Sequence, residues 1–172
     1  MTVIHNKGIT LIGMPGAGKS TIGKILAERL GFKFIDLDVF IKEKEGKSHA
    51  EIAKKRGDDA LVKIEETYTL GLDFDKVVFS PGGSIVYSPL AMEKVASQTT
   101  IFYLALPLET IRKRLGNGVE TRGVVGFERL GLKGVFDERE PLYLSYANNV
   151  IQCRGLSDAE IVQKINEILQ HK

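Results

Sequence analysis

The sequence predicts an α/β fold in which helices cover both faces of a five-stranded parallel sheet. Short apolar segments alternate with longer amphipathic segments along the whole chain. The apolar segments are continuous runs, which is typical of parallel strands buried on both faces. A chain of 172 residues without a repeat or a low-complexity linker indicates one domain over residues 1–172.

Turn and cap signals separate the predicted elements. The expected strands cover residues 8–12, 32–36, 77–79, 101–104 and 149–152. Helices are expected from residue 22 to the stop at Gly31, from the cap Ser88-Pro89, from Pro107 to 115, and over 157–169. Ser157 and Glu160 form a capping box at the start of the last helix.

Two segments interrupt this regular alternation. Residues 37–72 contain two or three charged helices, which we expect to form a helical insert. Residues 116–134 hold six glycines among charged residues. We expect this second segment to be a lid that closes over a ligand, although a flexible surface loop would have the same composition.

Composition excludes several function classes. The 24 basic and 22 acidic residues leave a net charge of +2, too balanced for binding to nucleic acid or to a membrane by charge alone. No apolar run reaches the length of a membrane span, and the single cysteine, Cys153, excludes an internal disulfide. We therefore expect a cytoplasmic monomer, and we assign no role to its three scattered histidines.

The strongest motif is a phosphate-binding loop. Gly13–Ser20 fits the pattern GxxxxGK[ST], follows a predicted strand and precedes a helix. Glycines let backbone N–H groups converge on phosphate oxygens, lysine adds a charge, and the serine hydroxyl is a ligand for Mg²⁺. The motif predicts binding of a nucleoside triphosphate, ATP, with Mg²⁺. The nucleotide-binding residues are expected to be Gly13, Gly16, Ala17, Gly18, Lys19, Ser20 and Thr21.

Other motifs narrow the class of phosphate-loop protein. A GTPase would carry NKxD, but Asn6-Lys7 is followed by Gly8-Ile9, and no aspartate has a glycine three residues later. The chain is too short for a motor or an AAA-type ATPase. Its size and its glycine-rich segment favour a kinase acting on a small molecule or a nucleotide.

Asp36 and Asp38 are the candidates for the acceptor side. They end the second predicted strand, at the sheet edge where open α/β sheets bind ligands. Residues two apart share one side of a strand, so we expect one carboxylate to face the metal and the other to face an acceptor hydroxyl. Solvated loop acids or the N-cap of the next helix would explain the same residues.

Several motifs, taken in order, resemble those of the shikimate kinases. They are Phe34-Ile35-Asp36-Leu37-Asp38, Gly46-Lys47-Ser48 with Ile52, Gly82-Gly83, and Glu138-Arg139-Glu140-Pro141-Leu142-Tyr143. The resemblance implies a P-loop three-layer α/β/α fold with a five-stranded parallel sheet, a helical acceptor-binding insert and a lid. It also implies an ATP-dependent kinase that phosphorylates a hydroxyl of a small metabolite, with shikimate as the leading acceptor.

The resemblance also implies residue roles. Asp36 would hold Mg²⁺ through water, Asp38 would bind the acceptor and receive or orient its hydroxyl proton, and Arg139 would grip the acceptor carboxylate. The glycines Gly82 and Gly83 would bring backbone N–H groups close to the acceptor. Arg139 could instead pair with a neighbouring glutamate, and the glycines could form only a tight turn.

Two further arginines complete the predicted site. Arg122, in the glycine-rich segment, is the candidate to reach the transferring phosphoryl group, so Lys19, Asp38 and Arg122 form the expected catalytic set. Arg114 is expected to stack on adenine, although a solvated helix face would explain it equally well.

The chain departs from the family at the acceptor pocket. Leu61 and Val62 stand where the family has phenylalanine followed by a carboxylate-binding arginine, Ala53 replaces a second phenylalanine, and Ser84 replaces a third glycine. Another hydroxylated metabolite therefore remains an alternative acceptor. A regulator that binds ATP without catalysis is the alternative from a different class.

Overall fold

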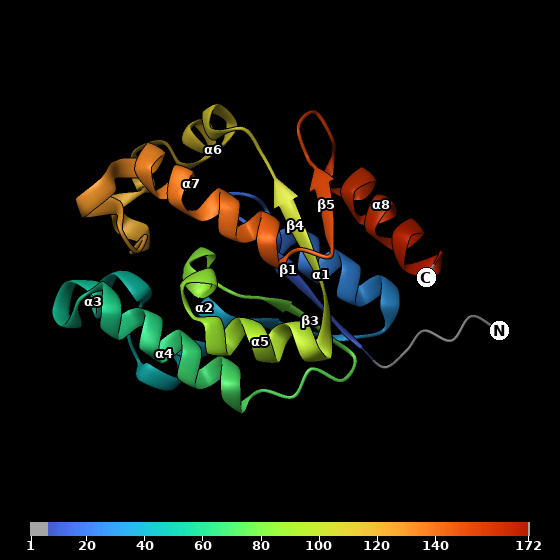
Figure 1. The fold of residues 1–172 in the computed structure, drawn as a ribbon, viewed down its shortest axis with the longest axis horizontal. Helices are drawn as coiled ribbons and strands as arrows, with labels where there is room; N and C mark the ends of the chain where they lie inside the picture. The colour runs from blue at the N-terminus through green and yellow to red at the C-terminus, as the bar shows by residue number, and fades with distance from the viewer. Residues whose placement is uncertain (1–6, 172) are drawn as a thin grey trace.

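A five-stranded parallel sheet lies at the centre of the computed structural model, which describes residues 7–171 (Figure 1). Its strands are β1 Gly8–Ile12, β2 Lys33–Asp36, β3 Val77–Ser80, β4 Thr99–Ala105 and β5 Asn149–Gln152. They are ordered β2-β3-β1-β4-β5, and all four neighbouring pairs are parallel. The predicted fold class is confirmed, and each expected strand lies within two residues of its predicted bounds.

Helices cover both faces of this sheet. Helix α1 Lys19–Leu30 packs against α8 Asp158–Gln170 on one face, while α5 Pro89–Gln98 and α7 Phe127–Tyr146 lie across the other (Figure 1). Helix α6 Leu108–Leu115 follows β4. All residues of β1 and β3 are buried, as the continuous apolar runs indicate.

The predicted helix caps also form in the structure. Gly31 adopts φ 67° and ends α1, since glycine enters this left-handed region without a steric penalty. Ser88 accepts a hydrogen bond from the N–H of Ala91 at the start of α5. The capping box of Ser157 and Glu160 is present at α8. Local sequence therefore sets these helix ends.

The segment between β2 and β3 forms three helices, which places an insert beside the carboxyl ends of the strands. They are α2 Leu37–Glu45, α3 His49–Arg56 and α4 Asp58–Gly71. A capping box of Ser48 and Glu51 opens α3. Helix α4 packs against α5 and against the 3₁₀ turn Gly83–Tyr87, so the insert is anchored next to the end of β3.

The glycine-rich segment is partly helical. Residues 116–122 form two short 3₁₀ turns, and the long helix α7 begins already at Phe127, inside the range 116–134 expected for the lid. No helix was expected in this range, and α7 contains two residues that disfavour a helix, Gly131 and Pro141. The helix kinks at Gly131, and the burial of residues such as Val135 and Tyr143 stabilises it despite its weak local propensity.

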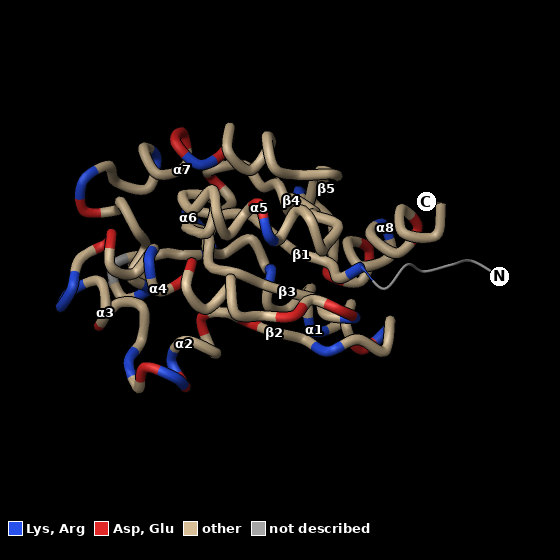
Figure 2. Tube along the Cα trace, turned by 60° about the horizontal axis from the view of Figure 1, so that its bottom comes forward, with Lys and Arg blue, Asp and Glu red and all other residues tan. Residues whose placement is uncertain are grey.

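Charged residues of both signs are interspersed along the outer helices (Figure 2). Between residues 7 and 171, no helix combines the length and the apolar character needed to span a membrane.

Candidate active site

The phosphate-binding loop joins β1 to α1 and curls over the end of the sheet. Gly16 and Gly18 adopt φ values of 81° and 97°, which let the loop turn into the first residue of α1, Lys19. The Lys19 Nζ atom donates hydrogen bonds to the carbonyl oxygens of Gly13 at 2.9 Å and Met14 at 3.0 Å. Burial lowers the pKa of Lys19 to about 8, although the charge of Asp38 opposes this shift. The loop thus holds a desolvated ammonium group at its centre.

Ser20 and Asp36 form an oxygen-rich pair beside the loop. The Ser20 hydroxyl donates to Asp36 Oδ2 at 2.5 Å. The other carboxylate oxygen of Asp36 accepts from the N–H groups of Asp38 at 3.0 Å and Val39 at 3.2 Å, so Asp36 is also the N-cap of α2. A hydroxyl and a carboxylate side by side are the hard oxygen donors that Mg²⁺ prefers, so the pair fits a magnesium ion.

The prediction that Asp36 and Asp38 share one side of a strand is wrong. Helix α2 begins at Leu37, so Asp38 lies in the first turn of a helix and does not continue β2. The N-cap, left open as an alternative for Asp36, forms in addition to the contact with Ser20. Both aspartates nevertheless line one cavity, because capping by Asp36 turns the chain directly at the sheet edge.

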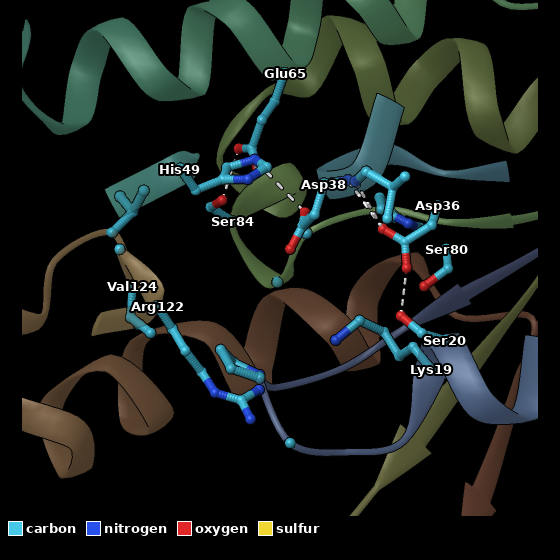
Figure 3. A pocket seen from close by; sticks show the side chains of 18 of the residues that line it. Lys19, Ser20, Asp36, Asp38, His49, Glu65, Ser80, Ser84, Arg122 and Val124 are labelled. Carbon is cyan, nitrogen blue, oxygen red and sulfur yellow. Dashed lines mark hydrogen bonds and ion pairs between the residues drawn. The ribbon is translucent and has the colours of Figure 1, made fainter. Parts of the chain in front are cut away.

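Asp38 belongs to a three-residue cluster with His49 and Glu65. The His49 Nε2 atom lies 3.5 Å from Asp38 Oδ1 and 3.5 Å from Glu65 Oε1 (Figure 3). The surrounding walls of the cavity partly desolvate the Asp38 carboxylate and raise its pKa, and His49 opposes that shift. Burial would lower the pKa of His49, but Glu65 and Asp38 outweigh it and raise that pKa above its ordinary value. Asp38 is open to the cavity, with 58% of its side chain exposed, whereas only 1% of the Glu65 side chain is exposed.

After the end of β3, the backbone at Gly82 and Gly83 passes close to charged side chains of the site. A Cβ atom on Gly82 would lie 2.5 Å from Glu65 Oε1, and one on Gly83 would lie 2.7 Å from a guanidinium nitrogen of Arg139. Only glycine therefore fits at either position without moving a charged group. The Gly83 carbonyl also accepts a hydrogen bond from the Tyr143 hydroxyl at 2.7 Å.

Arg139 is buried and faces the cavity. Its guanidinium donates to the carbonyl oxygen of Val125 at 2.8 Å and to the Tyr87 hydroxyl at 3.3 Å, and it lies over the Tyr87 ring at 5.1 Å. The pairing with a neighbouring glutamate does not form: Glu138 pairs with Arg129 instead. Only 1% of Arg139 is exposed, so its charge is directed to the interior.

The glycine-rich segment lies against the insert, and the end of α6 lies against the phosphate loop. A Cβ atom on Gly123 would lie 2.5 Å from the backbone nitrogen of Ala50 on α3, and the Gly126 N–H donates to Asp58 on α4 at 2.7 Å. These contacts place Arg122 at the cavity wall near Lys19 (Figure 3). Arg114, at the end of α6, donates to the Gly16 carbonyl at 3.1 Å.

One cavity of about 600 Å³ brings most of the predicted site residues together. Gly13 and Ala17 are outside its lining: the Gly13 carbonyl is bound to Lys19, and Ala17 is buried beneath the loop. The predicted residues that line the cavity are Gly16, Gly18, Lys19, Ser20, Thr21, Asp36, Asp38, Gly82, Gly83, Arg114, Arg122 and Arg139.

Sequence reasoning missed three further residues of the site. His49, to which we assigned no role, and Glu65 and Ser84 all line the cavity. The Ser84 hydroxyl donates to Glu65 Oε2 at 2.6 Å, so the serine that replaces a family glycine holds this buried carboxylate. Spacing gave no signal for His49, which is 11 residues from Asp38 and 16 from Glu65 along the chain.

Of the four departures from the family, Ser84 lines the cavity and the other three lie behind its wall. Among the described residues that line the cavity, none is Ala53, Leu61 or Val62. Leu61 is fully buried in the core, and Ala53 and Val62 are partly buried against it.

The arrangement separates the charges of the cavity. Four of the lysines and arginines that line it, Lys19, Arg114, Arg122 and Arg139, come from the loop, α6, the glycine-rich segment and α7, and a fifth, Lys42, comes from α2 of the insert. The carboxylates of Asp38 and Glu65 face it from the insert (Figure 3). Such a cavity can hold a polyanion on the cationic side and a neutral hydroxyl beside Asp38.

Comparisons with known proteins agree with this geometry. The sequence profile of the family described as "Shikimate kinase" matches residues 15–170. The shikimate kinase of Persephonella marina is 34% identical over 160 residues, which are 92% of this chain and 96% of that protein. The shikimate kinase of Clostridium botulinum (strain Eklund 17B / Type B) is 33% identical over 94% of this chain and 96% of its own. The structure of the Acinetobacter baumannii shikimate kinase in complex with shikimate superposes with a TM-score of 0.87 and 27% identity, over 95% of this chain and 92% of the other.

Proposed function

This chain belongs to the shikimate kinase family, and on this premise we propose that it transfers the terminal phosphoryl group of ATP to a hydroxyl of shikimate. The observation that carries the proposal is the shared cavity: the phosphate loop with Lys19 and the acceptor-side Asp38 line it together. A phosphoryl group bound by the loop and a hydroxyl bound by Asp38 would therefore meet inside one cavity.

On the donor side, Lys19 would bind the β- and γ-phosphates as a point charge, since its ammonium lies at the centre of the loop. Ser20 and Asp36 would hold Mg²⁺, directly and through water respectively. The ion would neutralise charge on the phosphate oxygens during transfer. Arg122 would approach the transferring group from the glycine-rich segment, which would then act as the lid, and Arg114 would lie beside the adenine.

On the acceptor side, Asp38 would orient the hydroxyl and receive its proton. Arg139 would bind the shikimate carboxylate, because its planar guanidinium is buried and faces the cavity. Because Gly82 and Gly83 carry no side chain, their backbone N–H groups would lie close to the same ligand. These positions would hold donor and acceptor at reaction distance, which is the main catalytic device in phosphoryl transfer.

The proposal needs no second copy of the chain, because the described residues that line the cavity come from one chain. We therefore propose that the enzyme acts as a monomer. We also propose that this ATP-dependent enzyme works in the cytoplasm.

An ADP-release assay tests the function. We expect ADP formation that requires shikimate and Mg²⁺, with other hydroxylated metabolites inactive at equal concentration. Release with another acceptor but not with shikimate would contradict the proposed substrate and favour the altered-acceptor alternative. ATP binding without any acceptor-dependent release would favour a non-catalytic regulator.

The Asp38→Asn variant tests the proposed role of Asp38. We expect shikimate-dependent turnover to fall at least about a hundredfold, since amides are poor proton acceptors at the reaction centre. The affinity for ATP with Mg²⁺, measured by calorimetry, should stay within about twofold. Unchanged turnover would remove Asp38 from the mechanism.

A further inference from the structure

A histidine lies between the two carboxylates of the acceptor side. His49 is the first residue of α3, and its side chain is 10% exposed. Its Nε2 atom is equidistant, at 3.5 Å, from oxygens of Asp38 and Glu65 and makes no ordinary hydrogen bond. The ring nitrogen thus faces two acids at once, an arrangement that suits a shared positive charge.

Glu65 needs a cation at this place. Its side chain is 1% exposed, and the oxygen that does not face His49 accepts from the neutral hydroxyl of Ser84. A buried carboxylate without a positive partner is strongly destabilising. Within residues 7–171, His49 is the one basic side chain within 4.0 Å of Glu65 or Asp38.

The helix that carries Glu65 brings no basic group to it at the neighbouring position 62. Val62 and Glu65 are three residues apart on α4, a spacing at which side chains of a helix are neighbours, and valine carries no charge. The neighbouring helix α3 supplies the basic group, His49, to this carboxylate.

We propose that His49, as an imidazolium, is a positioning residue of the acceptor pocket: it neutralises Glu65 and holds the Asp38 carboxylate toward the cavity. The inference rests on the proposed function, in which Asp38 binds the acceptor hydroxyl. Without the cation, the two neighbouring carboxylates repel each other, and Asp38, which is the exposed member, turns away from the acceptor.

The surroundings of the ring are consistent with its protonation. Glu65 faces it from α4, Asp38 faces it from α2, and Asp36 adds negative charge from the start of α2. The basic residues Lys42 and Arg122 line other walls of the same cavity. The balance of these groups raises the pKa of His49.

The variants His49→Gln, Glu65→Gln and the double variant test the charge relation. We expect His49→Gln to lower kcat/KM for shikimate at least about tenfold, while the KM for ATP changes less than twofold. The kcat/KM of the double variant should be within about threefold of that of Glu65→Gln alone, because removing the Glu65 charge removes the need for a cation. His171→Gln, at the exposed end of α8, is the matched control and should equal the wild type.

Two outcomes would overturn the inference. One is a His49→Gln variant as active as the control, and the other is a double variant whose loss of kcat/KM equals the product of the two single-variant losses. The double variant also covers a folding failure of His49→Gln, since glutamine at position 65 leaves no uncompensated charge. Circular dichroism of each variant identifies such a failure.

An NMR titration of the His49 ring separates this inference from the proposed function. The ring should be protonated at pH 7 in the wild type, and its titration midpoint should fall in Glu65→Gln. If the wild type does not phosphorylate shikimate but shows this titration, the substrate is wrong and the charge role of His49 is retained. A neutral ring at pH 7 refutes the role whatever the activity.

Discussion

Replacement of Gly82 by alanine places a methyl group directly against the two carboxylates of the acceptor side. Gly82 has φ −60° and ψ 157°, a conformation that alanine adopts freely, so backbone strain does not contribute. The added Cβ would lie 2.5 Å from Glu65 Oε1 and 3.1 Å from Asp38 Oδ1. The substitution therefore acts only on the side chains around it.

The size of the effect follows from these two distances. Ordinary van der Waals contact begins at 3.4 Å, so the Glu65 oxygen must move by about 0.9 Å and the Asp38 oxygen by about 0.3 Å. Glu65 cannot move freely, because Ser84 holds its other oxygen at 2.6 Å and its side chain is buried. A misplacement of about 1 Å can reduce the rate about a hundredfold, and this sets the upper limit here, because Glu65 moves by about that distance while Asp38, at the reacting hydroxyl, moves by only about 0.3 Å. We expect kcat/KM for shikimate to fall between about tenfold and a hundredfold.

Steady-state kinetics with each substrate varied in turn measures this effect. The KM for ATP should stay within about twofold, because the phosphate loop lies on the other side of the cavity. Gly71→Ala is the matched control: no atom lies within 4 Å of its added Cβ, so its activity should equal that of the wild type. A Gly82→Ala enzyme within threefold of this control would refute the reasoning.

Two other predictions concern the donor side. Asp36→Asn keeps an effective N-cap for α2 but loses the charge, so the Mg²⁺ concentration for half-maximal activity should rise at least about tenfold while the thermal midpoint stays within a few degrees. Lys19→Met should reduce turnover at least about a hundredfold. It should also leave the nucleotide-free protein at least as stable as the wild type at pH 7 in urea unfolding, because burial lowers the pKa of Lys19 to about 8 and disfavours its charged form in the folded state. This gain in stability over the wild type should fade between pH 8 and 10.5, because the folded wild type loses the Lys19 proton near pH 8 and the unfolded chain loses it near 10.5. A Lys19→Met protein clearly less stable than the wild type at pH 7 would contradict this prediction.

The donor half of the site could be predicted from the sequence because it is contiguous. The glycines, Lys19 and Ser20 of the phosphate loop lie within eight residues, and the loop needs only a strand before it and a helix after it. Cap residues such as Ser88 and Ser157 act within three residues of themselves, so they too are readable in the sequence. Continuous apolar runs likewise indicated the strands and their burial.

Tertiary packing decided the rest. Helix α7 forms across Gly131 and Pro141 because its buried face packs against the body of the protein, a contribution that local propensity does not contain. The acceptor half joins Asp38, His49, Glu65 and Gly82 from four separate parts of the chain. No spacing rule links such residues, because the distances between them depend on how the insert docks against the end of β3. The sequence alone thus determined the loop in which we propose that phosphate binds, and only the folded chain decided which charges surround the proposed acceptor position.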